Sequence, residues 1–282
     1  MRTWSRPPKR KLDEMSDGTV VSLWRYPVKS MMGEELNASD VTDRGLLGDR
    51  ALALVDTETA KVVSAKNPRK WPRMFEFRAA FTTPPVVGSS LPSVRVTLPD
   101  GLMVTSDDAR FAELVSTALG RPVTLATPGT SQLSLEEYWP DLAELEYQET
   151  VTDEAMPAES FFDLGAIHLL TIATINRLRD LYPEGRFEVR RFRPNIVLRH
   201  DDDANFVESG WVGRRLRVGD DVVLQITDHC PRCVMTTLAQ GDLPKDSGIL
   251  RTAARHNNVN VGVYAEVLRP GTIRRGDVVT LV

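Results

Sequence analysis

The residues best suited to chemistry are two cysteines, Cys230 and Cys233, in the stretch "TDHCPRCVMTTL" at residues 227–238. They are the only cysteines in the sequence. Thiolates bind soft metals and take part in disulfide exchange, so two thiols at this spacing have several possible roles. They can form a redox pair, contribute half of a zinc site, provide one metal ligand beside a bystander, or simply be two buried thiols.

The sequence meets the demands of a zinc site or a redox pair poorly. A structural zinc site needs about four N or S ligands. The remaining ligands would have to come from His168, His200, His229 and His256, which show no spaced pair. A thioredoxin-type pair needs a helix after its first thiol, because the helix dipole lowers the thiol pKa. The residues after Cys233 read "VMTTLAQGDLP", which is a poor helix start. Neither role is favoured.

A single thiolate ligand to a metal requires neither further N or S ligands nor a helix after the first thiol. A soft thiolate suits a soft or high-valent metal, and Arg232 beside Cys233 would help to keep that sulfur deprotonated. A bound anionic cofactor would need further cations and backbone donors nearby. The chain offers them in "YPVKS" (residues 26–30), "GDR" (48–50) and "RFRPN" (191–195). Each segment lies at the end of a predicted strand, where loops can converge on one pocket.

The elements that must position these residues are mainly strands. Runs such as "TVVSLWRYPV", "RALALVD", "FEFRAAF" and "SVRVTLPDG" predict an antiparallel β domain over residues 19–121, closed by one helix in "SDDARFAELVSTALG". The second half opens with the strand "IHLLT" and the helix "TIATINRLRDLYPEG", which Thr171 or Thr174 can cap. Further strand candidates predict a barrel over residues 161–282. The predicted fold class is α+β, predominantly β, with a few helices.

Two segments fall outside these domains. Residues 1–18 are polar and charged and predict a disordered tail, and residues 122–160 predict an acidic linker with a possible short helix. No Lys or Arg lies between Arg121 and Arg177, whereas ten acidic residues do, so the rest of the chain carries a net charge of 35 − 29 = +6. This segregation allows a cationic pocket elsewhere. The linker itself is either solvated or a docking surface for a cationic partner.

The bulk properties exclude several classes of protein. No apolar run is long enough to cross a bilayer, and the N-terminal residues lack the apolar region of a secretory signal. With two cysteines and no export signal, we expect a cytoplasmic protein with reduced thiols. No basic stripe interleaved with aromatic residues predicts nucleic-acid binding, and no glycine-rich phosphate loop predicts a nucleotide site.

Taken together, several segments in this order resemble the MOSC proteins, a family named for the C-terminal domain of molybdenum cofactor sulfurase, with the N-terminal β-barrel domain that often precedes it. The similarity is strongest to the amidoxime-reducing component and its bacterial relatives. The matching segments are "YPVKSMMGEELN", "GLLGDRALALVD", "HLLTIATINRL", "RFRPNIVL", "HCPRCVMTTL" and "GVYAEVLRPGTIRRGDVV". They cover most of residues 19–282, and the combination of "RFRPN" with "CxRCxxTT" is highly specific.

The resemblance implies a pterin-based molybdenum cofactor in a basic cleft between the two domains. It places the thiolate ligand to molybdenum at Cys233, with Arg232 beside it, and makes Cys230 a neighbour rather than a ligand. The positions that hold the pterin and its phosphate correspond to Lys29, Ser30, Arg50, Arg193 and Asn195. Lys and Arg can make charge-assisted hydrogen bonds to phosphate, and Asn can donate to and accept from a pterin edge.

The implied activity is that of a molybdenum oxidoreductase that reduces a small N-hydroxylated or N-oxide substrate. Because the sequence contains no flavin, haem or iron–sulfur motif, we expect electrons to come from a separate donor protein. Pro231 stands where relatives can carry a Ser, so only its carbonyl could contact the cofactor there. The alternative is a non-catalytic carrier of molybdenum cofactor, or of sulfur as a persulfide on Cys233.

Overall fold

The computed structural model describes residues 18–129, 132–145, 147–157, 159–200 and 205–282. The predicted tail lies outside this part of the chain, apart from Gly18. Strands predominate in the described residues, and helices are few, so the predicted fold class is confirmed. None of the described helices is long and apolar enough to cross a membrane.

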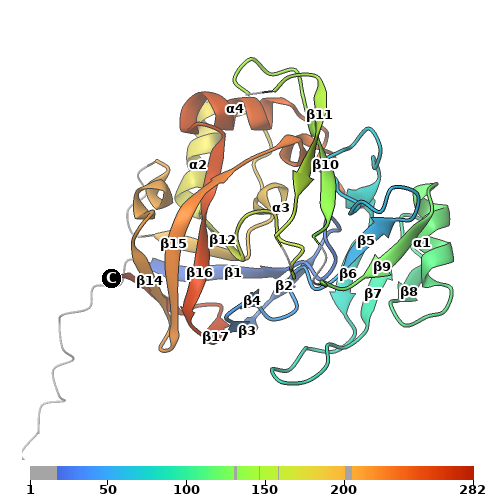
Figure 1. Ribbon diagram of the computed structural model, residues 1–282. Helices are drawn as coiled ribbons and strands as arrows, with labels where there is room; N and C mark the ends of the chain where they lie inside the picture. The colour runs from blue at the N-terminus through green and yellow to red at the C-terminus, as the bar shows by residue number, and fades with distance from the viewer. Residues whose placement is uncertain (1–17, 130–131, 146, 158, 201–204) are drawn as a thin grey trace, which may run out of the picture.

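Seven strands close into a barrel that forms the larger half of the molecule (Figure 1). In spatial order they are β13 (Ile196–His200), β12 (Ile167–Thr171), β16 (Asn260–Arg269), β15 (Val222–Pro231), β14 (Arg215–Val218), β18 (Val278–Leu281) and β1 (Gly18–Arg25). The ring closes because β1 pairs with β13 on one side and with β18 on the other. The short strand β2 (Glu34–Leu36) pairs with β1 outside the ring.

The barrel core follows from the alternation of apolar residues along these strands. Leu23, Ile196, Leu216 and Ile226 come from four different strands, and each is at most 1% exposed. Burying one such side chain contributes about 1.5–3 kcal/mol. Trp211, at the end of the 3-10 helix η2 (Val207–Trp211), packs against the same core. The barrel is therefore a packed scaffold, and the chemistry must take place outside its interior.

Helices pack against one side of the barrel. They are α2 (Ile172–Leu181), α3 (Val189–Phe192) and α4 (Gly248–Asn257). The predicted cap of α2 is confirmed at Thr171, whose side chain accepts a hydrogen bond of 3.1 Å from the Thr174 backbone N–H. The buried Glu208 carboxylate accepts hydrogen bonds of 2.6 Å from both threonine hydroxyls, and it ties η2 to the start of α2.

The N-terminal half is built from small sheets and, among its described residues, one α-helix. Most of these elements surround an apolar core of their own, whereas Val41 and Leu46 pack into the barrel core. Its strands are β3 (Ala38–Thr42), β4 (Gly45–Leu46), β5 (Ala53–Asp56), β6 (Arg78–Phe81), β7 (Val94–Thr97) and β8 (Met103–Thr105). A 3-10 helix, η1 (Met74–Glu76), precedes β6. The predicted helix is α1 (Phe111–Leu119), which ends at Gly120 in the left-handed conformation that glycine adopts without strain.

The two halves share strands. β1, from the start of the chain, belongs to the C-terminal barrel, and β17 (Gly271–Arg274), from the end of the chain, pairs with β3 of the N-terminal half. The chain therefore crosses the boundary between the halves near both of its ends. This exchange fixes the position of the loops that lie along the boundary.

The regular elements in the described part of the acidic segment are all strands, so the possible short helix expected in residues 122–160 is wrong. The segment contains β9 (Val123–Ala126), which pairs with β5, and an antiparallel hairpin of β10 (Ser134–Trp139) and β11 (Thr150–Ala155). Its carboxylates reach the basic stretch 61–70: Glu137 lies 2.9 Å from Lys66, and Asp153 lies 2.6 Å from Lys61. These ion pairs and the strand pairing override the local preference, because both depend on residues distant in the sequence.

Candidate functional site

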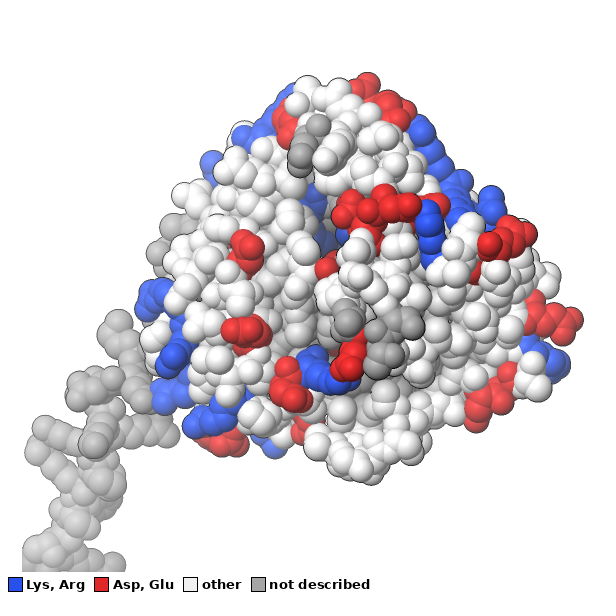
Figure 2. Space-filling view, in the orientation of Figure 1, with Lys and Arg blue, Asp and Glu red and all other residues white. Residues whose placement is uncertain are grey.

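A cavity lies beside the β10–β11 hairpin, at the boundary between the two halves. Figure 2 shows a hollow there, with Lys or Arg atoms inside it and carboxylates at its edge. All seven site residues predicted from the sequence line this cavity: Lys29, Ser30, Arg50, Arg193, Asn195, Arg232 and Cys233. They come from loops far apart in the sequence, so the fold brings them together.

Other lining residues were not predicted from the sequence as part of this site. Among them are Lys66, Glu137, Asp163 and Tyr264, together with His168, which the sequence offered only as a possible zinc ligand. Only one signal could have revealed any of them, the cluster of basic residues around Lys66. The lining includes five cationic side chains and three carboxylates, a balance of 5 − 3 = +2. Arg50 also pairs with Asp49, which lies outside the lining, so counting Asp49 reduces the excess to 5 − 4 = +1. Positive charge that remains uncompensated in a partly desolvated cavity favours an anionic ligand.

Left-handed backbone is concentrated around this cavity. The φ angles are 64° at Ser30, 46° at Arg50, 55° at Arg193 and 71° at Val259, all four of which line it. Residues other than glycine rarely adopt this conformation, and Val259 is β-branched, so each position stores strain. The surrounding contacts must maintain it. One example is Ser30, whose hydroxyl oxygen accepts a hydrogen bond of 3.1 Å from the Ala65 backbone N–H.

Two arginines of the cavity make cation–π contacts with the same aromatic ring. The guanidinium carbons of Arg193 and Arg50 lie 4.2 Å and 4.5 Å from the centre of the Tyr26 ring. Arg193 also donates a hydrogen bond of 2.7 Å to the Met31 carbonyl. Burial and the charge of Arg50 lower the pKa of Arg193 to about 10, so it stays charged at neutral pH. Cation–π contacts of this kind hold guanidinium groups in place without neutralising them.

The side-chain amide of Asn195 uses most of its hydrogen-bonding capacity within the protein. Its amide nitrogen donates to the Asp49 carboxylate at 2.9 Å and to the Trp24 carbonyl at 3.3 Å. Its amide oxygen accepts from the His168 backbone N–H at 3.1 Å. Because both amide hydrogens are used, only the oxygen can accept a further bond. Asn195 therefore positions the cavity wall and has no donor left for a ligand.

Two lysines are held by carboxylates. Lys29 Nζ donates to Asp163 Oδ1 at 2.7 Å and to the Phe161 carbonyl at 2.8 Å. Lys66 Nζ lies 2.9 Å from Glu137 and 3.7 Å from Asp163. Burial lowers the pKa of Lys29. Burial alone would raise the pKa of Asp163, but the two lysines hold it well below its usual range, so Asp163 is ionised at neutral pH.

The two cysteines occupy different environments. Cys230 is 0% exposed near the end of β15, whereas Cys233, directly before the 3-10 helix η3 (Val234–Thr237), is half-buried and lines the cavity. Arg232 Nη1 donates to Cys230 Sγ at 2.6 Å, and Nη2 donates to the Phe192 carbonyl at 2.9 Å. Arg232 Nε is buried with no partner among the described residues. A ligand acceptor would satisfy such a donor.

The sequence predicts that Arg232 helps to keep Cys233 deprotonated, and its charge acts in that direction, but burial outweighs it. Burial, followed by the charge of Glu137, raises the pKa of Cys233 to about 11, although Lys66 and Arg232 act in the opposite direction. The hydrogen bond from Arg232 goes to Cys230 instead. A thiolate at Cys233 therefore needs a further positive charge. A bound metal supplies it, because a coordinating thiol loses its proton.

The alternatives for the cysteines find little support in the described residues. These residues contain no group of three or more His, Cys, Asp or Glu that could hold a metal ion, so the ligands of a structural zinc site are missing there. A dithiol centre needs an accessible thiol pair, whereas Cys230 is completely buried. Both cysteines are free thiols.

His168 makes stability depend on pH. Burial, together with the charge of Arg232, lowers its pKa to about 3, and its Nε2 donates to the Val261 carbonyl at 3.0 Å. The unfolded chain binds this proton near pH 6.5, so stability falls as pH drops from 6.5 towards 3. We expect this group to cost about 2 kcal/mol between pH 7.5 and 5.0. Urea unfolding at both pH values should show this loss in the wild type but not in His168→Gln, and equal losses would contradict it.

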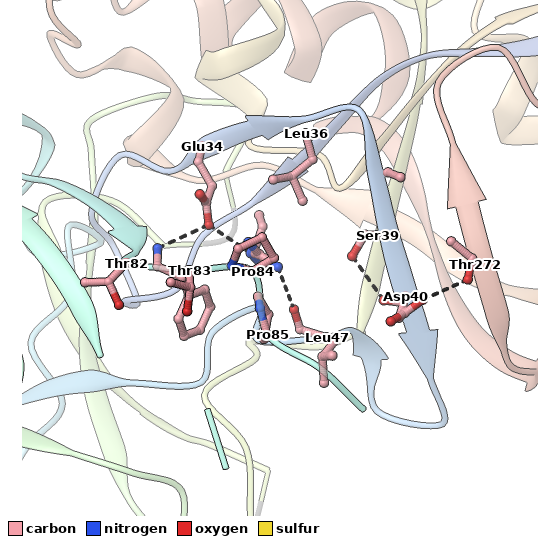
Figure 3. A pocket seen from close by; sticks show the side chains of 13 residues that line it. Glu34, Leu36, Ser39, Asp40, Leu47, Thr82, Thr83, Pro84, Pro85 and Thr272 are labelled. Carbon is pink, nitrogen blue, oxygen red and sulfur yellow. Dashed lines mark hydrogen bonds and ion pairs between the residues drawn. The ribbon is translucent and has the colours of Figure 1, made fainter. Parts of the chain in front are cut away.

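A second cavity lies between β2, β3 and the loop after β6 (Figure 3). Its charged groups already have partners. Glu34 accepts a hydrogen bond of 2.9 Å from Arg25, and Asp40 accepts one of 2.8 Å from Thr272. None of the predicted site residues lines it. It therefore lacks the uncompensated positive charge that marks the first cavity.

Comparison with known proteins identifies the family of the chain. The MOSC N-terminal beta barrel domain model matches residues 17–122, and the MOSC domain model matches residues 159–280. "Mitochondrial amidoxime reducing component 2" of Rattus norvegicus is 25% identical over 260 residues, which are 88% of this chain and 73% of that protein. "Mitochondrial amidoxime-reducing component 1" of Homo sapiens is 25% identical over 317 residues, which are 99% of this chain and 87% of that protein.

Among solved structures, the YuaD protein from Bacillus subtilis aligns with a TM-score of 0.48 at 13% identity, and the alignment covers 95% of this chain and 97% of that one. The two family models together match most of the described chain, and residues 123–158 lie between the two matches. The chain therefore belongs to the MOSC family and carries the MOSC N-terminal β-barrel domain ahead of its MOSC domain.

Proposed function

We propose that this protein is a molybdenum-cofactor-dependent oxidoreductase that reduces N-hydroxylated or N-oxide compounds, with Cys233 as the thiolate ligand to molybdenum. One observation carries the proposal: the half-buried Cys233 thiol lines a cavity whose lining has more cationic side chains than carboxylates. The similarity to proteins named amidoxime reducing components supports the substrate class. We place the protein in the cytoplasm, where two free thiols stay reduced.

The residues present fit an anionic pterin cofactor. Arg50, Arg193 and Arg232 would make charge-assisted hydrogen bonds to its phosphate and pterin, and the unpartnered Nε of Arg232 is one such donor. Lys29 and Lys66 would add positive charge. Asn195, whose amide hydrogens are already used, would hold the wall against which the cofactor rests.

The reaction would break the N–O bond of the substrate, take up two electrons and two protons, and release the oxygen as water. When bound, the molybdenum cofactor supplies this two-electron chemistry, and the protein fixes orientation and charge. The electrons would come from a separate donor protein. Neither Asp163, which two lysines keep ionised, nor His168, which is neutral and bonded to a carbonyl, is the proton donor at neutral pH.

The test is elemental analysis and turnover on protein purified from a host that makes the molybdenum cofactor. We expect about one molybdenum per chain, and reduction of benzamidoxime to benzamidine with reduced methyl viologen as the electron source. Zinc in place of molybdenum, or no metal at all, would contradict the proposal. Molybdenum that dissociates readily, with no reduction of benzamidoxime, would favour the cofactor-carrier alternative instead.

A further inference from the structure

The β10–β11 hairpin and the residue that follows it form one wall of the cavity. The lining residues from this segment are Leu135, Glu137, Trp139, Glu154, Ala155 and Met156. The cationic side chains come from other parts of the chain. The wall thus combines apolar and acidic side chains, whereas the remainder of the cavity carries the positive charge.

Glu154 differs from the other two carboxylates of the cavity. Glu137 pairs with Lys66, and Asp163 pairs with Lys29. Glu154, in contrast, has no cationic partner within 4.0 Å among the residues that the structure describes. A carboxylate in a partly buried wall without a cation is a site where a ligand cation would be stabilised.

The Glu154 carboxylate is held in place by its neighbours. Thr152 donates a hydrogen bond of 2.7 Å to Glu154 Oε1, and the Trp139 indole N–H donates one of 2.8 Å to Thr152 Oγ1. The Trp139 ring packs against Tyr147, with ring centres 5.2 Å apart. The aromatic ring and the carboxylate are therefore linked through one hydroxyl group, so a ligand would meet them already oriented.

Charge balance shows which ligand this wall would favour once a cofactor is bound. The lining has a net charge of 5 − 3 = +2. A phosphate group carries about −1.5 to −2 near pH 7, so the phosphate of the cofactor alone offsets that excess. Glu154 is already counted in that balance, but it differs from the other two carboxylates because no cationic side chain lies within 4.0 Å of it among the described residues. The ring of Trp139 adds a second preference for positive charge, because cations are attracted to aromatic faces.

We propose that Glu154 and Trp139 select N-oxygenated substrates that carry a positive charge. This inference rests on the proposed function for the position of the reacting N–O group, but the charge preference is a property of the wall. The substrate class is an aromatic N-oxygenate with a cationic substituent, bound with that substituent against the Glu154 carboxylate and the Trp139 ring.

The experiment compares two ligands of the same shape and different charge: benzamidoximes with a trimethylammonium or a tert-butyl group in the para position. Calorimetry on the oxidised, molybdenum-loaded protein measures binding, and methyl viologen oxidation measures turnover. We expect the cation to bind about fivefold more tightly than its neutral isostere, a ratio typical of a partly exposed ion pair. The Glu154→Gln variant should lose this preference, because it keeps the side-chain shape and removes only the charge.

Asp153→Asn is the matched control, since Asp153 precedes Glu154 on β11 but pairs with Lys61 and is not part of the cavity lining. It should keep the wild-type preference. Equal binding of the two isosteres by the wild type, or an equal loss of affinity for both in Glu154→Gln, would overturn the inference. A charge preference without any reduction of either compound would support the inference and contradict the proposed function.

Discussion

A Cys233→Ser variant is expected to retain no molybdenum and to reduce no benzamidoxime. The thiol is the soft ligand of the cavity, and a serine hydroxyl at the same position neither ionises at neutral pH nor binds molybdenum as a thiolate does. The cationic residues would remain, so the variant could still attract the cofactor but not anchor its metal. Elemental analysis of wild type and variant, purified side by side from the same host, measures the loss directly.

Cys230→Ser is the control for this prediction, because it changes a thiol three positions away that does not line the cavity. A serine oxygen can still accept the hydrogen bond that Arg232 now donates to Cys230 Sγ. We therefore expect Cys230→Ser to keep most of its molybdenum. Equal losses of molybdenum from the two variants, with both proteins folded, would mean that the cysteines act as a pair. A dithiol centre or a zinc site would then be the better assignment.

Much of the fold could be predicted from local patterns. The run "SVRVTLPDG" contains β7, and the helix expected after it is α1, with Gly120 at its end. Thr171 caps α2 as expected. The destination of β1 could not be predicted, because its alternating pattern fits a strand in either half. Only its pairing with β13 and β18 places it in the barrel.

Part of the candidate site could likewise be predicted from the sequence, and part could not. Cys233, Arg193 and the other predicted residues belong to short motifs that could be recognised in the sequence, and all of them line one cavity. Trp139 and Glu154 belong to a segment whose acidic composition resembled a linker. They reach the cavity through a hairpin that depends on cross-strand pairing and on ion pairs with residues 61–70. The hairpin is local, but its ion pairs join residues distant in the sequence, and such contacts leave no pattern in the segment itself.

Asp49 joins the two halves at the site, and its loss is expected to be severe. This buried carboxylate accepts a hydrogen bond of 2.8 Å from the Tyr26 backbone N–H and one of 2.9 Å from the Asn195 side chain, and it also pairs with Arg50. Tyr26 and Arg50 belong to loops of the N-terminal half, and Asn195 directly precedes β13 of the barrel. One carboxylate therefore fixes the position of two predicted cofactor contacts.

Asp49→Asn should lower the free energy of unfolding by about 3 kcal/mol, because it leaves the largely buried charge of Arg50 without its partner. Urea unfolding of the metal-free protein measures the loss, and Asp153→Asn, which removes an exposed charge, should change stability by less than about 1 kcal/mol. Combining Asp49→Asn with Arg50→Met should recover part of the loss, since no unpaired charge then remains buried. A double variant no more stable than Asp49→Asn alone would show that the hydrogen bonds to Tyr26 and Asn195, rather than the ion pair, carry the effect.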